Sequence, residues 1–221
     1  IEAARLNKVK RILSFLSSCI YSDKTAQPYN ENNIHDGEPF KDYYPYGYSK
    51  RMLEVQSRIC YEEFGLQYNC VIPTNIYGIN DNFNIETGHV IGVLIHKAFL
   101  AKKNNTDFII WGDGNQEREF LFTEDVKNLT KWALENYLDK EPLVFSNNIK
   151  VKIKDIANII YDKFKLKKRL IFDSSKPSGQ INRSLDGTKL KNLYPIKFTS
   201  IEEGINQTID WFIDIYPNIR K

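Results

Sequence analysis

Short apolar runs alternate along this chain with longer segments whose apolar residues recur every three or four positions. The short runs have the length of buried strands and begin with RILSFLSSCIY at 11–21; the others are YNCVIP at 68–73, FIIWGDG at 108–114, REFLFTEDV at 118–126, LVFSN at 143–147 and RLIFD at 169–173. The periodic segments predict helices over 46–64, 89–103, 153–164 and 200–216. Strands that alternate with helices predict an α/β protein with a mainly parallel sheet.

Several helix ends are marked by single residues. Gly65 stands where the helix from Tyr46 must stop, and Thr123 is expected to cap the helix that follows REFLF. Ser200 and Glu203 form a capping-box pattern before the last helix. Its buried stripe is expected to include Ile201, Ile205, Ile209, Phe212 and Ile213.

The domain organisation follows from these elements. We expect residues 1–78 to belong to a doubly wound, Rossmann-like sheet and 79–221 to form mainly a smaller substrate-binding lobe. Segments near 120–147 are expected to return to the first domain. The phosphate-binding GxGxxG loop occurs nowhere in the sequence; GDGNQE at 112–117 lacks the third glycine and precedes a strand, so it predicts a turn. Hence the opening strands of such a fold, with their glycine-rich loop, are expected to be absent from this chain.

Composition narrows the class of protein. The chain has 221 residues and a net charge of +3 from 31 basic and 28 acidic residues, which argues against a polybasic surface for nucleic acid or membrane. No apolar run is long enough to span a membrane, and no signal peptide is visible. Cys19, Cys60 and Cys70 lack the spacing of a metal or disulfide framework. A reduced, cytoplasmic protein without a metal site is therefore expected.

The strongest chemical signal is the pair Tyr46 and Lys50, one helical turn apart on one face. An ammonium beside a phenol stabilises the phenolate, which suits the phenol to proton donation toward a carbonyl. Tyr161 and Lys165 show the same spacing inside an ordinary amphipathic helix, so the spacing alone is weak evidence. Ser17, Ser18 and Cys19 strengthen it, because ligands of parallel sheets bind beyond the carboxyl ends of strands.

The other candidate residues each have an ordinary structural interpretation beside the chemical one. Cys19 can act as a proton-abstracting thiolate or fill the core as a small apolar residue. His89 can be a general acid or a structural histidine, and His96, seven residues on, lacks carboxylate partners for a metal site. Lys97 and Arg118 can hold a phosphate or be solvated surface charges.

Taken together, the sequence resembles the GDP-L-fucose synthases, which are extended short-chain dehydrogenase/reductases. The resemblance runs in family order and rests on SSCIY (17–21), YGYSK (46–50), PTNIYG (73–78), DNFNIETGHVI (81–91), WGDGNQEREF (111–120) and FDSSKPSGQ (172–180). It implies conversion of GDP-4-keto-6-deoxy-D-mannose by epimerisation at C3 and C5 and reduction at C4 with NADPH. It also implies a homodimer.

The resemblance assigns roles to particular residues. Cys19 is the base and His89 the acid of epimerisation, and Ser17, Tyr46 and Lys50 form the reduction triad. The residues that would line the cofactor are Phe15, Leu16, Ser17, Ser18, Tyr46, Lys50, Pro73, Thr74, Asn75, Ile76 and His89. The residues that would hold the GDP-sugar are Lys97, Trp111, Arg118 and Ser178.

The sequence departs from the family at three of these places. Lys97 stands where arginine is familiar, Gly92 where proline is usual, and Ser178 where bacterial and animal members have aspartate. A lysine at position 97 replaces a bidentate fork with a point charge. Two alternatives stay open: a nucleotide-sugar epimerase without net reduction, and a non-catalytic remnant that serves as a dimer-forming module.

Overall fold

The structure is a computed structural model that describes residues 1–176 and 184–220 and divides into two compact units. The first unit comprises 1–74, 125–148 and 184–197, and the second comprises 75–124, 149–176 and 198–220 of the described residues. Ser178 lies outside the described residues, so the structure places no part of it. Among the described residues, no helix combines the length and apolarity needed to cross a membrane.

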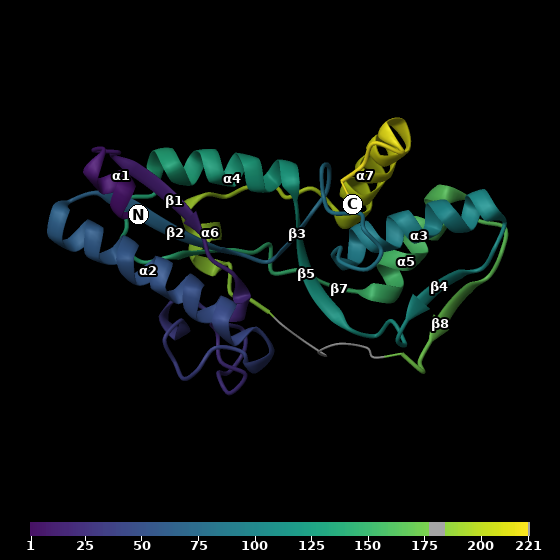
Figure 1. The fold of residues 1–221 in the computed structure, drawn as a ribbon, viewed down its shortest axis with the longest axis horizontal. Coiled ribbons are helices and arrows are strands. Elements are labelled where there is room, and N and C mark those ends of the chain that lie inside the picture. Colours follow the sequence, from purple (N-terminus) through teal and green to yellow (C-terminus); the bar gives the residue numbers. More distant parts are fainter. Residues whose placement is uncertain (177–183, 221) are drawn as a thin grey trace. The chain divides into compact units, whose positions relative to one another are not determined.

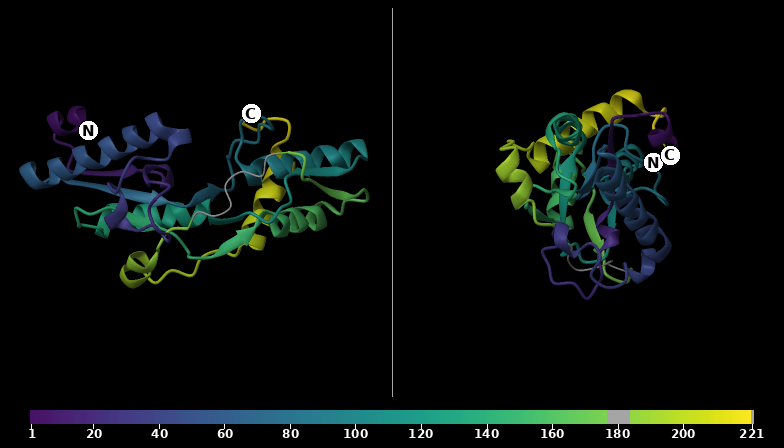
Figure 2. Two further views of the ribbon diagram at one scale, coloured as in Figure 1. Left: turned by 90° about the horizontal axis from the view of Figure 1, so that it is seen from below. Right: turned by 90° about the vertical axis from the view of Figure 1, so that its left-hand side faces the viewer.

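The first unit is built on a three-stranded parallel sheet in the order β1-β2-β6. Its strands are β1 (Arg11–Phe15), β2 (Gln67–Pro73) and β6 (Leu143–Phe145). Its helices are α1 (Glu2–Leu6), α2 (Tyr44–Phe64), most of α4 (Thr123–Asn136) and α6 (Thr188–Leu193). Three short 3₁₀ turns precede α2: η1 (Ser18–Ile20), η2 (Glu31–Asn33) and η3 (Lys41–Tyr43). The helices α2 and α4 lie on opposite sides of this sheet (Figures 1 and 2), as in a doubly wound fold.

The core of the first unit lies at the carboxyl end of β1. Its buried side chains include Leu16, Ile20, Tyr21, Ile72 and Val144. Leu185, from the last segment of this unit, joins the same cluster, and the segment also forms a bridge from Leu185 to Tyr29. The apolar residues after β1 therefore anchor the polar Ser-Ser-Cys stretch in a fixed place.

The second unit has two small sheets and three long helices. Its strands are β3 (Asn75–Tyr77), β4 (Phe108–Trp111), β5 (Glu117–Phe122), β7 (Lys150–Lys152) and β8 (Leu170–Asp173). Its helices are α3 (Val90–Asn104), α5 (Ile153–Phe164) and α7 (Ile201–Ile215). β3 pairs with β5 and β4 with β8 in parallel, whereas β5 pairs with β7 antiparallel. The apolar faces of the three helices share one core with residues such as Ile95, Ile160 and Phe212.

Most expected elements are present, and the exceptions are informative. The helix 153–164 is observed with those bounds, and Gly65 ends α2 in the left-handed conformation with a φ of 64°. The expected turn at GDGNQE separates β4 from β5. The serine half of the capping box is present, because Ser200 accepts a hydrogen bond from the backbone of Glu203.

Two expectations about individual residues are wrong. Ile213 is 46% exposed and does not belong to the buried face of α7. Thr123 is the first residue of α4, and its buried hydroxyl has no hydrogen-bond partner among the described residues, so it does not cap the helix. The strands β3 and β7 and the helix α6 are not among the elements that the pattern predicts.

Candidate active site

The site in the first unit begins where β1 ends. The backbone of Leu16 still donates to the carbonyl oxygen of Val71 (2.8 Å), which extends the strand pairing by one residue. Ser17 then caps η1, and its Oγ accepts a hydrogen bond from the backbone of Cys19 (3.3 Å). The side chains of Ser17 and Cys19 are both partly exposed, so Cys19 is not a fully buried core residue. A hydroxyl and a thiol are thus presented at the carboxyl edge of the sheet.

Helix α2 brings Tyr46 and Lys50 to this strand end. The Nζ of Lys50 donates to the carbonyl oxygen of Phe15 (2.7 Å), and it lies 5.7 Å from the centre of the Tyr46 ring. Tyr46 is 46% exposed, so its hydroxyl can be reached by a substrate. A phenol and an ammonium therefore lie together beside the strand that carries Ser17 and Cys19.

The second tyrosine–lysine pair has a different place. Tyr161 lies on α5, and its hydroxyl donates to the backbone carbonyl of Lys168 (2.9 Å). Lys165 is the left-handed residue that ends this helix, with a φ of 53°. Tyr161 and Lys165 therefore help to end α5. The tertiary structure thus separates this pair from Tyr46 and Lys50, although the sequence spacing of the two pairs is identical.

Gly47 lets α2 approach the strand end closely. A Cβ at this position would lie 2.8 Å from the carbonyl oxygen of Cys19 and 2.5 Å from the Cβ of Pro39. Both distances are too short for real contacts, so only glycine permits this packing. The glycine between Tyr46 and Tyr48 thus helps to set the position of Tyr46 relative to Cys19.

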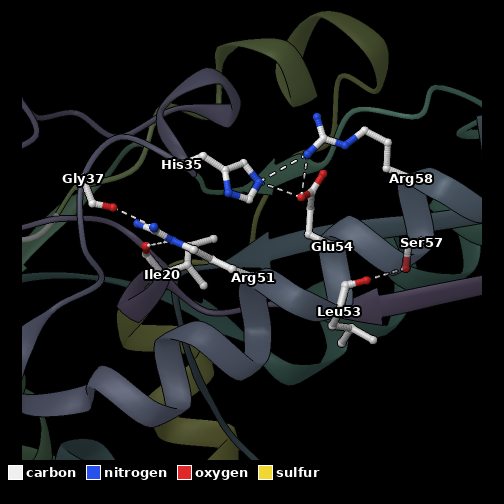
Figure 3. Close-up of polar contacts among 8 residues, drawn as sticks. All are labelled: Ile20, His35, Gly37, Arg51, Leu53, Glu54, Ser57 and Arg58. Carbon is white, nitrogen blue, oxygen red and sulfur yellow. Dashed lines mark hydrogen bonds and ion pairs between the residues drawn. The ribbon is translucent and has the colours of Figure 1, made fainter.

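The inner face of α2 carries polar groups that sequence reasoning missed (Figure 3). Glu54 is 2% exposed, and its carboxylate accepts hydrogen bonds from His35 Nε2 (2.7 Å) and Arg58 Nη2 (3.0 Å). Arg51 donates to backbone carbonyls of Ile20 and Gly37. In the sequence, Arg51 and Glu54 are marked only by their positions one and four residues after Lys50, on the same helix. These contacts fix the 22–43 segment on α2.

The carboxyl end of β2 contributes a second polar group. The backbone of Thr74 donates to the carbonyl oxygen of Phe145 (3.0 Å). Its hydroxyl is buried, and among the described residues it has no hydrogen-bond partner. Pro73 ends β2, whereas Asn75 and Ile76 belong to β3 of the second unit. A buried, unsatisfied hydroxyl is costly, so Thr74 marks a place where a ligand could supply the missing bond.

A cavity of about 1070 Å³ lies in the first unit beside these groups, but none of the expected catalytic residues lines it. It is enclosed by the loop segments after Tyr21 and before α2. Its lining residues are Ser22, Asp23, Lys24, Thr25, Ala26, Asn33, Asp36, Gly37, Glu38, Pro39, Lys41 and Tyr44. We place the candidate chemistry at the strand ends, where the phenol, ammonium, hydroxyl and thiol occur together, and not in this cavity.

The remaining expected residues belong to the second unit. His89 is the exposed residue that precedes the first turn of α3. Asp81 acts on it through charge: burial raises the pKa of Asp81, and the charge of His89 opposes that rise. One carboxylate oxygen of Asp81 is buried without a partner among the described residues.

Lys97 and Trp111 are brought together within this unit. The Nζ of Lys97 lies 4.8 Å from the centre of the Trp111 ring, and burial lowers the pKa of Lys97. Trp111 is 60% exposed, so a broad aromatic surface remains available. Arg118 on β5 donates to the backbone carbonyl of Glu117 (2.8 Å).

His96 has a structural role. It is 6% exposed, and its Nδ1 donates to the backbone carbonyl of Phe83 (2.7 Å). This bond ties α3 to the segment that precedes it.

Comparison with known proteins places these residues in a family. Residues 1–146 match the NAD dependent epimerase/dehydratase family. The GDP-L-fucose synthase of Dictyostelium discoideum is 42% identical over 216 residues, which are 96% of this chain and 68% of that protein. The probable GDP-L-fucose synthase of Drosophila melanogaster is 34% identical, over all of this chain and 72% of its own length.

A solved structure agrees with this assignment. The GDP-L-fucose synthetase of Naegleria fowleri, in a crystal structure bound to NADP, superposes with a TM-score of 0.95 and 34% identity. The match covers all of this chain and 68% of that one. The motifs, the placement of the strand-end residues and these similarities lead to one conclusion: this chain belongs to the NAD dependent epimerase/dehydratase family, among the GDP-L-fucose synthases.

Proposed function

We propose that this chain forms part of an enzyme that converts GDP-4-keto-6-deoxy-D-mannose to GDP-L-fucose with NADPH. The observation that carries the proposal is the bond from Lys50 Nζ to the carbonyl oxygen of Phe15, at 2.7 Å. It holds the Tyr46–Lys50 pair at the end of the strand that bears Ser17 and Cys19. The names of the similar proteins support the substrate and the cofactor.

The strand ends fit the nicotinamide half of NADPH. The orphaned hydroxyl of Thr74 provides an unsatisfied donor and acceptor, and Lys50 provides a cation near Tyr46. Phe15, Leu16, Ser18, Pro73, Asn75 and Ile76 are the other proposed contacts from these strand ends. The 221 residues contain no glycine-rich phosphate loop, so the proposed contacts concern the nicotinamide half alone.

The reduction requires a proton at the C4 oxygen of the sugar. NADPH, when bound, supplies the hydride to C4. Tyr46 donates its phenolic proton to the C4 oxygen, and Lys50 stabilises the phenolate that remains. Ser17 donates a hydrogen bond to the same oxygen and orients the ketone.

The epimerisation requires a base and an acid. The C4 ketone acidifies the hydrogens at C3 and C5, because the negative charge that forms moves onto the ketone oxygen. We assign proton removal to the thiolate of Cys19 and proton return to His89. After each epimerisation step the Cys19 thiol loses its proton to water and His89 regains one from water. One acid and base pair can therefore serve both carbons.

The second unit is the proposed source of nucleotide contacts. Lys97 provides a positive charge for the diphosphate, and Trp111 provides an aromatic face. Arg118 offers a guanidinium that can bind two phosphate oxygens. Ser178 remains a candidate from the sequence only.

The proposal extends to the oligomeric state and the location of the protein. We propose a homodimer, because α2 leaves Met52 55% exposed and Ile59 43% exposed while its inner face is polar. We propose a cytoplasmic location, because the three cysteines are free thiols, which is usual in a reducing compartment.

The test is a two-product assay on the full-length protein. GDP-4-keto-6-deoxy-D-mannose and NADPH are supplied together, and NADPH oxidation and sugar products are followed by absorbance and chromatography. We expect one NADPH to be consumed for each GDP-L-fucose formed. Epimerised keto-sugar without NADPH consumption would favour the alternative of an epimerase without net reduction, and no change in the sugar would contradict both.

A further inference from the structure

Arg51 is a buried arginine directly after Lys50, and it joins three segments of the first unit (Figure 3). Its side chain starts on α2 and is 7% exposed. Nε donates to the carbonyl oxygen of Ile20 (2.8 Å), and Nη1 donates to the carbonyl oxygen of Gly37 (2.7 Å). One guanidinium therefore connects the helix of Tyr46 and Lys50, the turn that contains Cys19, and the loop before α2.

Burial of the Arg51 guanidinium without a carboxylate partner carries a desolvation cost. A buried cation normally pairs with a carboxylate, but Arg51 forms no ion pair within the described part of the chain. Burial lowers the pKa of Arg51, whereas Tyr48 and Asp36 act in the opposite direction. The centre of the Tyr48 ring lies 5.8 Å from the guanidinium carbon. The remaining nitrogen, Nη2, has no hydrogen-bond partner among the described residues. An apolar residue of similar length would fill the same space without a desolvation penalty.

The carbonyl that Arg51 holds belongs to Ile20, the residue directly after Cys19. Ile20 is the last residue of η1, and its carbonyl is one peptide unit beyond Cys19. On the other side of the turn, Ser17 Oγ accepts from the Cys19 backbone. The two contacts bracket Cys19, and the Arg51 contact links it to the helix that carries Tyr46.

We propose that Arg51 is the positioning residue for the Cys19 thiol, which it holds in register with Tyr46 and Lys50. The proposal rests on the proposed function, in which Cys19 removes the sugar protons. Arg51 touches neither substrate nor cofactor and acts through the backbone of η1. A lysine cannot replace it fully, because one ammonium lacks the fork that reaches two carbonyl groups.

The experiment compares Arg51→Met and Arg51→Lys with the parent in the full-length protein. The first measurement is deuterium entry at C3 and C5 of the keto-sugar in D₂O, with NADP⁺ in place of NADPH, from which kcat and KM are obtained. The second is the rate at which iodoacetamide alkylates each cysteine, followed by peptide mass spectrometry. Lys131→Met is the control, since it removes a cation from an exposed helix position of the same unit, on α4, away from η1.

We expect kcat for exchange to fall about 10²-fold in Arg51→Met with KM little changed, because a small displacement of a catalytic group costs about that much. Alkylation of Cys19 should become faster, since the turn loosens. Cys60 and Cys70 should stay slow, because both are buried and burial raises the pKa of the Cys70 thiol to about 12. Arg51→Lys should recover part of the exchange, and Lys131→Met should match the parent.

Three results would overturn the proposal. Parental exchange and parental Cys19 alkylation in Arg51→Met would show that the fork is dispensable. Faster alkylation of all three cysteines, in Arg51→Lys as well, would show that Arg51 supports the whole unit. A rise in KM alone would indicate substrate binding. If the parent itself shows no exchange, the proposed function fails, and the alkylation rates still decide whether Arg51 positions Cys19.

Discussion

Lys50 on α2 donates a hydrogen bond of 2.7 Å to the carbonyl oxygen of Phe15, the last residue of β1. The two residues are 35 positions apart in the sequence. This contact brings a phenol, an ammonium, a hydroxyl and a thiol to one edge of the sheet, and the proposed chemistry depends on it. The predictions below concern the groups that it brings together.

Cys19→Ala is expected to remove the base of epimerisation. With keto-sugar and NADP⁺ in D₂O, deuterium entry at C3 and C5 should fall about 10²- to 10⁴-fold, because water is a poor replacement for a positioned base. Nuclear magnetic resonance of the recovered sugar measures the exchange. Cys60→Ala is the control, since Cys60 is a buried thiol of α2. Parental exchange in Cys19→Ala would make Cys19 a packing residue.

Tyr46→Phe should separate the two reactions. Exchange at C3 and C5 should remain substantial, whereas NADPH-dependent reduction should fall about 10²- to 10⁴-fold, because the phenolic proton is needed as hydride reaches C4. Tyr161→Phe is a matched control from the second tyrosine–lysine pair and should leave both rates unchanged. Loss of exchange together with reduction in Tyr46→Phe would mean that the phenol also polarises the ketone during epimerisation.

Gly47→Ala should displace α2 from the strand end. The added Cβ would lie 2.8 Å from the Cys19 carbonyl oxygen, so the turn or the helix must shift. We expect a loss of about 1–3 kcal/mol in the free energy of unfolding and a fall in both reactions. Urea denaturation and the exchange assay measure these effects. Gln56→Ala, at an exposed position of the same helix, should change neither. Parental stability in Gly47→Ala would contradict the close approach.

The 221 residues by themselves should bind NADPH weakly. Without a glycine-rich turn at a helix N-terminus, the pyrophosphate lacks its usual anion site. Calorimetric titration is expected to give a Kd weaker than about 1 mM, which corresponds to about 4 kcal/mol of binding free energy. Circular dichroism of the same sample checks that it is folded. Micromolar affinity for NADPH would refute this prediction.

Met52→Glu should weaken the proposed homodimer. A charge beside the exposed apolar side chain of Ile59 and the half-buried Val55 would have to be buried in the interface without a partner. Sedimentation velocity of the full-length protein should show a shift from dimer toward monomer. Asn128→Glu adds the same charge at an exposed position of α4 and should leave the assembly unchanged. A monomeric parent would remove the basis of the prediction.

The long elements and their ends could be predicted from the sequence because the responsible interactions are local. Ile156, Ile160 and Phe164 repeat at helical spacing, and α5 is observed with its expected bounds. Gly65 adopts the left-handed conformation that other residues rarely take, so it marks the end of α2. The family motifs likewise occupy short, continuous stretches, so the sequence alone indicated the family.

The tertiary structure decided which polar residues belong to the strand-end site. Tyr46–Lys50 and Tyr161–Lys165 have identical spacing, and their contacts separate them: Lys50 bonds to Phe15 at the strand end, whereas Tyr161 bonds to Lys168 at the end of its own helix. Arg51 and Glu54 are buried on the inner face of α2, where a sequence pattern predicts apolar residues. Two backbone carbonyls accept hydrogen bonds from Arg51 there, and His35 and Arg58 form hydrogen bonds with Glu54. Their partners are 14 to 31 residues away, except for Arg58. Local periodicity reports only neighbours along the chain, so contacts between distant segments become visible only when the chain is folded.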